Sequence, residues 1–388
     1  MTKPSGKAGR ASILYINADP GTQIPEMTLA GIRRYARAVG WCAEAIASAE
    51  SAAEEIPALI ASFAPVVGCV YESANDAAPP PPNVFGGLPV VYLHAARLPA
   101  GNQTARVTTD NAAVARTAFR ELSEGRPAAY AVAGVRESSA WTLERERVFR
   151  ALAAESGLRC ATFQRRRDEL PNDRAKRLAA WVARLPDHTA VFATNDLASA
   201  EIVAAAKAAA RAIPNELTLL GVDNRPNICE DSTPTLSSIQ IDFERAGYMA
   251  AEIIAAGGGG ATASFGPLLA VRRESTGGSG RRDKLILLAV ERIRREACEG
   301  LTAAAMAASF PGTRRLFELR FREATGHSVL DEIQHIRLER ACALLSRTDT
   351  PISAIAAFCG FRSDRALRKV FLARAGMSMQ KWRSKNRR

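Results

Sequence analysis

The sequence predicts an α/β segment followed by an all-α segment that contains two helix-turn-helix units. Three observations lead to this fold class. Before residue 272, short apolar runs alternate with amphipathic stretches, a pattern typical of a mostly parallel sheet covered by helices. After residue 282, the apolar spacing is helical throughout. Within that helical part, chemically matched residues recur 50 positions apart, which indicates a duplicated unit.

The domain boundaries follow from these changes in pattern. A length of 388 residues suits two or three domains. We expect a disordered polar start over residues 1–10 and an α/β domain over residues 11–271. Residues 272–282 (RRESTGGSGRR) are expected to form a flexible linker, because glycine, serine and threonine interrupt the apolar spacing. Residues 283–388 form the predicted helical domain.

The α/β domain can be divided into elements by periodicity. Six apolar runs are expected to be strands, over residues 13–16, 66–71, 90–93, 129–133, 190–193 and 217–222. Amphipathic stretches are expected to be helices, over residues 27–39, 112–123, 144–156, 174–185 and 197–211. Residues 79–82 and 257–260 are expected to be loops, because prolines or glycines follow one another there.

Composition and motifs argue against membrane, secreted and enzyme classes. No apolar run reaches eighteen residues and no hydrophobic segment follows the polar start, so we expect a cytoplasmic protein without a membrane span. The seven cysteines are scattered and are interpreted as reduced thiols. Neither a nucleotide-binding glycine motif nor a GxSxG motif is present, and the four histidines are isolated. We therefore predict no catalytic residue, no metal and no cofactor.

The positive charge is confined to the C-terminal part. The formal net charge of the chain is +12. From Arg281 onward there are 23 basic and 11 acidic residues, whereas the rest of the chain carries 29 of each. A basic domain attached to a neutral one is typical of proteins that bind polyanions, because neutralising phosphates releases counterions.

The duplicated unit is a short helix, a tight turn and a second helix. The matched pairs are Thr313 and Ser363, Phe317 and Leu367, Phe321 and Phe371, Gly326 and Gly376, and Ser328 and Ser378. In each unit the hydroxyl residue can cap the second helix, over residues 313–326 or 363–376, and a glycine closes it. The short helices are expected over residues 302–309 and 352–359. A long amphipathic helix over residues 330–346 can fix both units rigidly, so that their second helices enter successive major grooves, about 34 Å apart.

The exposed positions of the second helices are the predicted contacts to double-stranded DNA. Arginine or lysine can donate to guanine, a carboxylate can accept from cytosine, and an apolar side chain can touch a thymine methyl. Each position is also compatible with mere solvation. The predicted DNA-binding residues are Thr313, Arg314, Arg315, Glu318, Leu319, Arg320, Ser363, Asp364, Arg365, Arg368 and Lys369.

The helical segment resembles the DNA-binding domains of the AraC family. The resemblance rests on RLERACALL (residues 337–345), IAAFCGF (355–361) and VFLARAG (370–376). Three residues depart from the family pattern. Leu319 lies where a groove-facing arginine is common, Phe310 replaces the expected turn glycine, and Met379 replaces a proline after Ser378. We therefore expect the first unit to have the less regular turn.

The α/β domain resembles the two-lobed sensors of periplasmic binding proteins and LacI-type repressors. The matching segments are IRRYARAVGW (residues 32–41), VTTDN (107–111), WTLERERVF (141–149), GVDN (221–224) and REST (273–276). The resemblance implies a polyol bound between the lobes, because carboxylates, amides and guanidinium groups can satisfy several hydroxyls at once. The predicted effector-binding residues, all at strand ends or helix starts, are Asp110, Arg145, Asn195, Asp196 and Asp223.

Two of these residues have an alternative structural interpretation. Asp110 is equally suited to cap the helix that follows it, and Arg145 to pair with a neighbouring glutamate. Residues 19–24, which follow the first strand, are expected to line the entrance of the site.

Together, the two resemblances imply a transcription regulator similar to the xylose regulators. This implies an activator with a pentose effector, a homodimer, and RNA polymerase as a further partner. A non-sugar effector, or none, is the alternative within the same class. An enzyme with chemistry between the lobes is disfavoured by the missing motifs. A structural DNA-binding protein would bind operator and random DNA equally.

Overall fold

A computed structural model describes residues 10–17, 24–47, 54–63, 65–72, 78–95, 97–134, 139–163, 166, 169–278 and 281–387. The expectations for residues 1–9 and 19–23 lie outside these ranges. The chain forms two compact units. The first contains the chain up to Thr108, Phe243–Phe265 and the residues from Leu288 onward, and the second contains Thr109–Asp242 and Gly266–Leu287.

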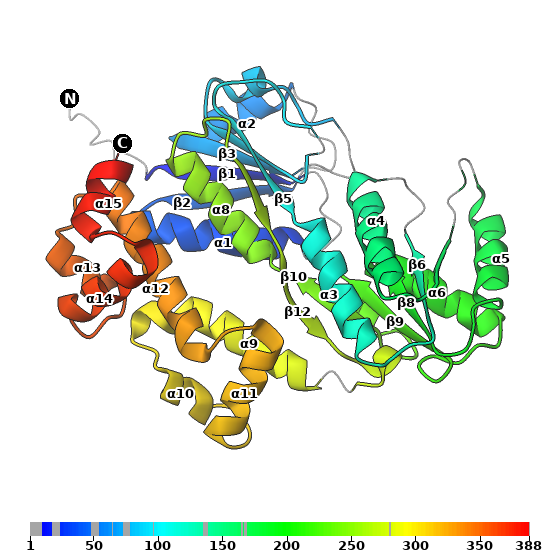
Figure 1. Cartoon of the computed structure of the whole chain (residues 1–388). Coiled ribbons are helices and arrows are strands. Elements are labelled where there is room, and N and C mark those ends of the chain that lie inside the picture. The colour runs from blue at the N-terminus through cyan, green and yellow to red at the C-terminus, as the bar shows by residue number, and fades with distance from the viewer. Residues whose placement is uncertain are drawn as a thin grey trace. The chain divides into compact units, whose positions relative to one another are not determined.

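The first unit is built around a six-stranded sheet (Figure 1). Its order is β11-β5-β4-β3-β1-β2, and the pairs from β5 to β2 are parallel. The strands are β1 (Ser12–Asn17), β2 (Cys42–Ala47), β3 (Val66–Glu72), β4 (Val90–Leu93), β5 (Thr104–Thr109) and β11 (Thr262–Phe265). The accompanying helices are α1 (Ile24–Val39), α2 (Ile56–Ser62), η1 (Pro82–Phe85) and α8 (Phe243–Ala255).

Two glycines allow α1 and α8 to cross closely. A Cβ atom at Gly31 would lie 1.9 Å from the carbonyl oxygen of Glu244, and one at Gly247 would lie 1.9 Å from that of Thr28. No side chain fits such spaces without moving a backbone. The backbones of the two helices therefore pack directly on each other, and Figure 1 shows the helices lying next to each other.

The second unit contains another six-stranded sheet. Its order is β12-β10-β9-β8-β6-β7, with β12 antiparallel to β10 and the pairs from β10 to β7 parallel. The strands are β6 (Ala129–Ala133), β7 (Cys160–Thr162), β8 (Thr189–Ala193), β9 (Leu217–Val222), β10 (Ser237–Ile241) and β12 (Pro267–Val271). The helices are α3 (Asn111–Ser123), α4 (Ala140–Glu155), α5 (Pro171–Val182), α6 (Asp196–Ala208) and α7 (Pro226–Cys229).

The C-terminal segment is wholly helical, as predicted. Its elements are α9 (Arg281–Glu296), η3 (Ala297–Glu299), α10 (Ala303–Ala308), α11 (Arg314–Thr325), α12 (Val329–Arg347), α13 (Ile352–Phe358), α14 (Asp364–Ala375) and α15 (Met379–Asn386). The helix-turn-helix pairs are α10 with α11 and α13 with α14. The predicted fold class, an α/β part with two sheets and a helical part with two such pairs, is confirmed.

The structure differs from the expected flexible linker over residues 272–282. Arg273 is buried, and its guanidinium donates to the carbonyl of Leu236 and to the Asn224 side chain, both at 2.8 Å. Residues Glu274–Thr276 form the short helix η2, and α9 already begins at Arg281. Residues 272–278 are held to the second sheet because their hydroxyl and guanidinium groups find partners there, which apolar periodicity does not register.

Glu339 of α12 lies at the centre of a charge cluster within the first unit. Its carboxylate accepts hydrogen bonds from Arg34 of α1 at 2.5 Å and from Arg245 of α8, and it lies 3.3 Å from His335 Nε2. Burial alone would raise the pKa of Glu339, but Arg34, His335 and Arg245 lower that pKa to about 2. The carboxylate therefore stays ionised and ties α12 to α1 and α8.

Candidate functional site

The second helices of the two helix-turn-helix pairs, α11 and α14, are the helices predicted to enter the DNA grooves and are called the recognition helices below. They begin and end with the same chemistry. Thr313 Oγ1 accepts a hydrogen bond from the Leu316 amide at 3.3 Å, and Ser363 Oγ accepts one from the Ala366 amide at 3.2 Å. Each helix ends at a glycine in the left-handed conformation, Gly326 with φ 82° and Gly376 with φ 68°. The 50-residue repeat is thus a repeat of helix capping, with one hydroxyl satisfying one otherwise orphaned amide each time.

The two turns differ, as the departures in the sequence predicted. In the first, Phe310 packs on Phe317 with ring centroids 4.8 Å apart and planes 16° from parallel, while Gly312 has φ 103°. In the second, Gly360 has φ 72°, and a Cβ there would lie 2.8 Å from the carbonyl oxygen of Ala297. The aromatic stack stabilises a turn that lacks the family's glycine.

The predicted DNA contacts divide into paired and unpaired side chains. Arg314 forms an ion pair with Glu318 at 2.8 Å, and Arg368 forms one with Asp364 at 2.7 Å. Among the residues that the structure describes, Arg315, Arg365 and Lys369 form no ion pair, and all three are exposed. Arg320 is half-buried beside the core residue Phe321, and Leu319 is 53% exposed. The unpaired cations are the ones available to a polyanion without first breaking an ion pair.

In the second unit, candidate effector residues gather where parallel strands end. Asn195 and Asp196 follow β8, and Asp223 follows β9. Arg145 comes from α4 and is 5% exposed. Its guanidinium donates to Asn111 Oδ1 at 2.9 Å and to the carbonyl of Thr194 at 2.6 Å. Its charge centre also lies 4.7 Å from the ring centroid of Trp141.

Arg145 and Asp223 are electrostatic neighbours. Burial lowers the pKa of Arg145, and the carboxylates of Asp223, Asp196 and Glu144 oppose that shift. Burial likewise raises the pKa of Asp223, while Arg145 and Arg225 oppose this shift. Asp223 is only half-buried and has φ 99°, a conformation that side chains rarely adopt. A carboxylate and a guanidinium are therefore held in place at the carboxyl edge of the sheet.

Asp196 has a role inside the unit that its sequence position did not reveal. Its side chain has no exposed surface. One oxygen accepts from Ser238 Oγ at 2.6 Å, and the other accepts from the Arg225 amide at 2.8 Å and from the Cys229 thiol at 3.3 Å. Asp196 thus joins β10 and the start of α7 to α6. Its contact with an effector remains a prediction, and one that would need rearrangement.

Asp110 and Asn195 both cap helices. Asp110 accepts from the Ala113 amide at 2.7 Å, and Asn195 Oδ1 accepts from the Ala198 amide at 2.9 Å. The capping alternative for Asp110 is therefore confirmed. The alternative for Arg145, an ion pair with a neighbouring glutamate, is not found among the described residues, because its guanidinium donates to the side-chain amide of Asn111 and to the backbone carbonyl of Thr194.

Sequence reasoning missed a polar cluster at the carboxyl edge of the first sheet. Glu72 ends β3 and is 5% exposed, and Tyr15 donates a hydrogen bond to it. His94, directly after β4, lies 3.5 Å from Glu72 and packs against the rings of Phe243 and Phe265. The sequence signal was available, since both residues follow predicted strands, but His94 was interpreted as isolated.

Two kinds of feature are absent from the described residues. Over the ranges given above, no group of three or more histidine, cysteine, aspartate and glutamate side chains is placed to hold a metal ion. In the same ranges, no helix combines the length and the apolar character needed to cross a bilayer.

Comparison with known proteins agrees with this geometry. A family model described as a periplasmic binding protein-like domain matches residues 110–276, and one described as a helix-turn-helix domain matches residues 306–385. The xylose operon regulatory protein of Escherichia coli is 29% identical over 274 residues, which cover 68% of this chain and 70% of that protein. Its namesake in Haemophilus influenzae is 26% identical over 286 residues, covering 71% and 74%.

A solved structure matches nearly the whole chain. The xylose-binding transcription activator xylR covers 98% of this chain and 100% of its own, with a TM-score of 0.55 and 22% identity. The order of the two domains is thus the same in both proteins. The chain therefore carries a periplasmic-binding-protein-like domain followed by a helix-turn-helix domain.

The burial of Asp196 predicts a pH dependence of stability. Burial, and then the neighbouring Asp223, raise the pKa of Asp196 to about 7 in the folded protein. In the unfolded chain, an aspartate has a pKa of about 4. Because the folded pKa is the higher one, the contribution of Asp196 to stability is fully present below about pH 4 and is lost as the pH rises to about 7.

We therefore expect Asp196→Asn to gain in melting temperature relative to wild type between pH 5 and pH 8, since the amide cannot ionise and can still serve both Ser238 and the Arg225 amide. The measurement is a series of thermal melts across that range. Asp187→Asn, an exposed position before β8, is the matched control and should show no such trend. A difference between Asp196→Asn and wild type that stays constant with pH would contradict the assignment.

Proposed function

We propose that this protein is a sequence-specific, sugar-responsive transcription regulator. Residues 283–388 are its DNA-binding domain, and a pentose such as xylose is its effector. The observation that carries the proposal is the pair of capped helices, α11 and α14, which present cations without an ion pair among the described residues. The first of these helices contacts the long helix α12, and the second shares a core with the second half of α12. Such a pair can read two adjacent half-sites, with Arg315 in one groove and Arg365 and Lys369 in the other.

The sugar part of the proposal rests on Arg145 and Asp223. A buried guanidinium and a half-buried carboxylate can donate to and accept from several hydroxyls of one small molecule, and Trp141 supplies an apolar face beside them. The names of the two bacterial relatives support xylose as the first sugar to test. Asp196 is left out of the direct contacts because its oxygens are already occupied.

Regulation requires that the effector bind one conformation of the sensor better than another. We propose that the bound sugar changes how paired DNA-binding domains of a homodimer engage adjacent operator sites in the cytoplasm. The outcome would be activation through contact with RNA polymerase. The homodimer, the activation and the contact with RNA polymerase are proposed because of the resemblance to xylose regulators. A non-sugar effector is the second candidate, and the ligand panel below distinguishes the two.

Arg365→Ala is expected to cost about 1 to 3 kcal/mol of specific DNA binding, because an exposed, unpaired arginine on the groove face would lose its base contact. The measurement is a gel-shift titration with operator and random DNA. Arg120→Ala removes the same charge from α3 in the other unit and serves as the control. Unchanged operator affinity of the Arg365 variant would refute the base contact, and equal affinity of wild type for both DNAs would refute sequence-specific binding.

A pentose at a hundredfold over its dissociation constant should stabilise the protein by about 2.7 kcal/mol. We expect Asp223→Asn to weaken that ligand roughly 10- to 100-fold, since a bond to a charged acceptor is lost, while asparagine tolerates the same positive φ. Thermal-shift titration with a panel of pentoses, hexoses and non-sugar metabolites measures this, with Asp187→Asn as the control. A shift produced only by a non-sugar would favour the second candidate. Equal affinity in the Asp223 variant would remove that residue from the site.

A further inference from the structure

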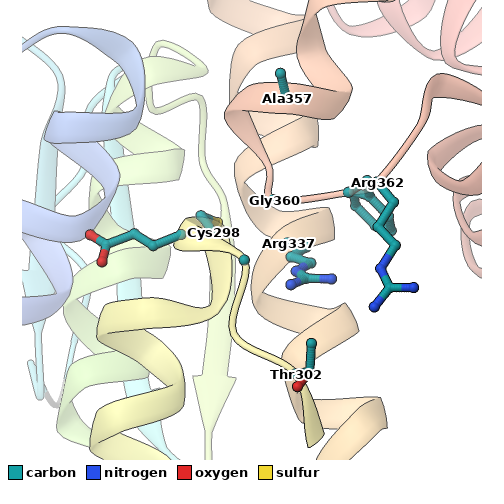
Figure 2. A pocket seen from close by; sticks show the side chains of 9 residues that line it. Cys298, Thr302, Arg337, Ala357, Gly360 and Arg362 are labelled. Carbon is teal, nitrogen blue, oxygen red and sulfur yellow. The ribbon is translucent and has the colours of Figure 1, made fainter. Parts of the chain in front are cut away.

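The helical domain contains an open cavity between its two helix-turn-helix units, with a volume of about 460 Å³ (Figure 2). One wall is the segment Cys298 to Thr302, which leads into α10 of the first helix-turn-helix unit. The opposite wall is the turn from Ala357 to Arg362, which joins α13 to α14 in the second helix-turn-helix unit. Arg337, from the middle of α12, forms the floor between them.

Arg337 is held rigidly in this position. Its Nε donates to the carbonyl of Ala297 and its Nη2 to the carbonyl of Leu301, both at 2.8 Å. The guanidinium carbon also lies 5.5 Å from the ring centroid of Phe361. These contacts fix the guanidinium plane, and they engage two of its three nitrogens with uncharged acceptors. The positive charge at the floor is therefore preorganised but not neutralised.

A second guanidinium lines the same cavity. Arg362 is exposed and directly precedes Ser363, the cap of recognition helix α14. Over the described ranges of the chain, neither Arg337 nor Arg362 forms an ion pair, although Glu299 is among the lining residues. Other arginines of this domain do have carboxylate partners, for example Arg374 with Asp331 and Arg387 with Asp349. Two uncompensated guanidinium groups at one hollow make it suitable for a small, multiply accepting anion such as phosphate.

The position of the cavity identifies the source of that anion. A duplex whose successive major grooves receive α11 and α14 must carry a stretch of sugar-phosphate backbone past the space between the two units. The turn residue Arg362 lies one residue before Ser363, the cap of the helix that enters the second groove. Gly360, in the same turn, lets the backbone pack directly against Ala297 and Cys298. The two walls are thereby kept close together.

We propose that this cavity is a backbone-phosphate site: Arg337 and Arg362 bind one phosphate of the operator between its two half-sites. The site carries no sequence information and sets the register of the domain on the duplex. This inference rests on the proposed function, because it requires that α11 and α14 occupy adjacent grooves.

Arg362→Gln tests the proposal, since the exposed turn position leaves the fold intact whereas Arg337 is structural. We expect operator and random DNA to be weakened by the same factor, and the slope of log affinity against log salt concentration to fall in magnitude by about 0.9, the value for one phosphate contact. Ethylation of individual phosphates should identify one position between the half-sites that interferes with wild type but not with Arg362→Gln. Arg374→Gln, whose arginine is already paired with Asp331, is the matched control and should leave that interference pattern unchanged.

Three results would overturn the site. They are an unchanged salt slope in Arg362→Gln, the same interference pattern in variant and wild type, and a loss confined to operator DNA, which would make Arg362 a base contact. A fourth arm uses inorganic phosphate without DNA. If millimolar phosphate stabilises wild type but not the variant while DNA binding is equal in both, the cavity is a free-anion site and the backbone assignment is wrong. Operator binding that still depends on Arg365 would show that the proposed function survives the failure of this inference.

Discussion

The geometry of the DNA-binding surface depends on the rigidity of one helix, α12. At 19 residues it is about 28 Å long, which is shorter than the rise of about 34 Å for one turn of a DNA duplex but long enough to reach both helix-turn-helix pairs. Its first half buries Val329, Ile333 and Ile336 and contacts α10 and α11. Its second half places Ala341, Leu344 and Leu345 in the core that holds α13 and α14. Both helix-turn-helix units pack on this one helix. The distance between them therefore cannot change without loss of core packing.

Charge plays two different parts along α12. Glu339 is buried among Arg34, Arg245 and His335, and its ion pairs join α12 to α1 and α8. Arg337, two residues earlier, donates to two backbone carbonyls and has no ion pair among the described residues, so its charge remains available at the floor of the cavity. The second sheet shows the same division. Asp196 is consumed by internal hydrogen bonds, whereas Asp223 stays half-buried beside Arg145. In both places the residue with spare bonding capacity is the better candidate for binding.

Local chemistry explains what the sequence could predict. The caps Thr313 and Ser363 and the glycines Gly326 and Gly376 act within one helical turn, so their spacing alone identified both recognition helices. The central strands β4, β6 and β9 were predicted at their observed bounds because both of their faces are buried and the apolar runs are continuous.

What escaped prediction depends on contacts between distant parts of the chain. The three residues of β7 are only half-buried, and in β2 (CAEAIA) alanine alternates with residues of mixed polarity, so neither strand gave an apolar run. The burial of Asp196 requires Ser238, which lies 42 positions later. Arg273 belongs to a segment that looks flexible by composition, yet it bonds to Asn224 across 49 positions. The repeated recognition helices were predictable for the opposite reason, since each carries its own start and stop signals.

The rigidity of α12 makes the central claim directly measurable. Repeated selection of binding sequences from a random DNA pool, followed by alignment of the enriched pool, reports how many half-sites one domain reads and how far apart they lie. The account predicts two half-sites of different sequence, separated by about 10 to 10.5 base pairs from centre to centre, with fixed spacing. A single half-site, a variable spacing between two, or no enrichment over random sequence would contradict it.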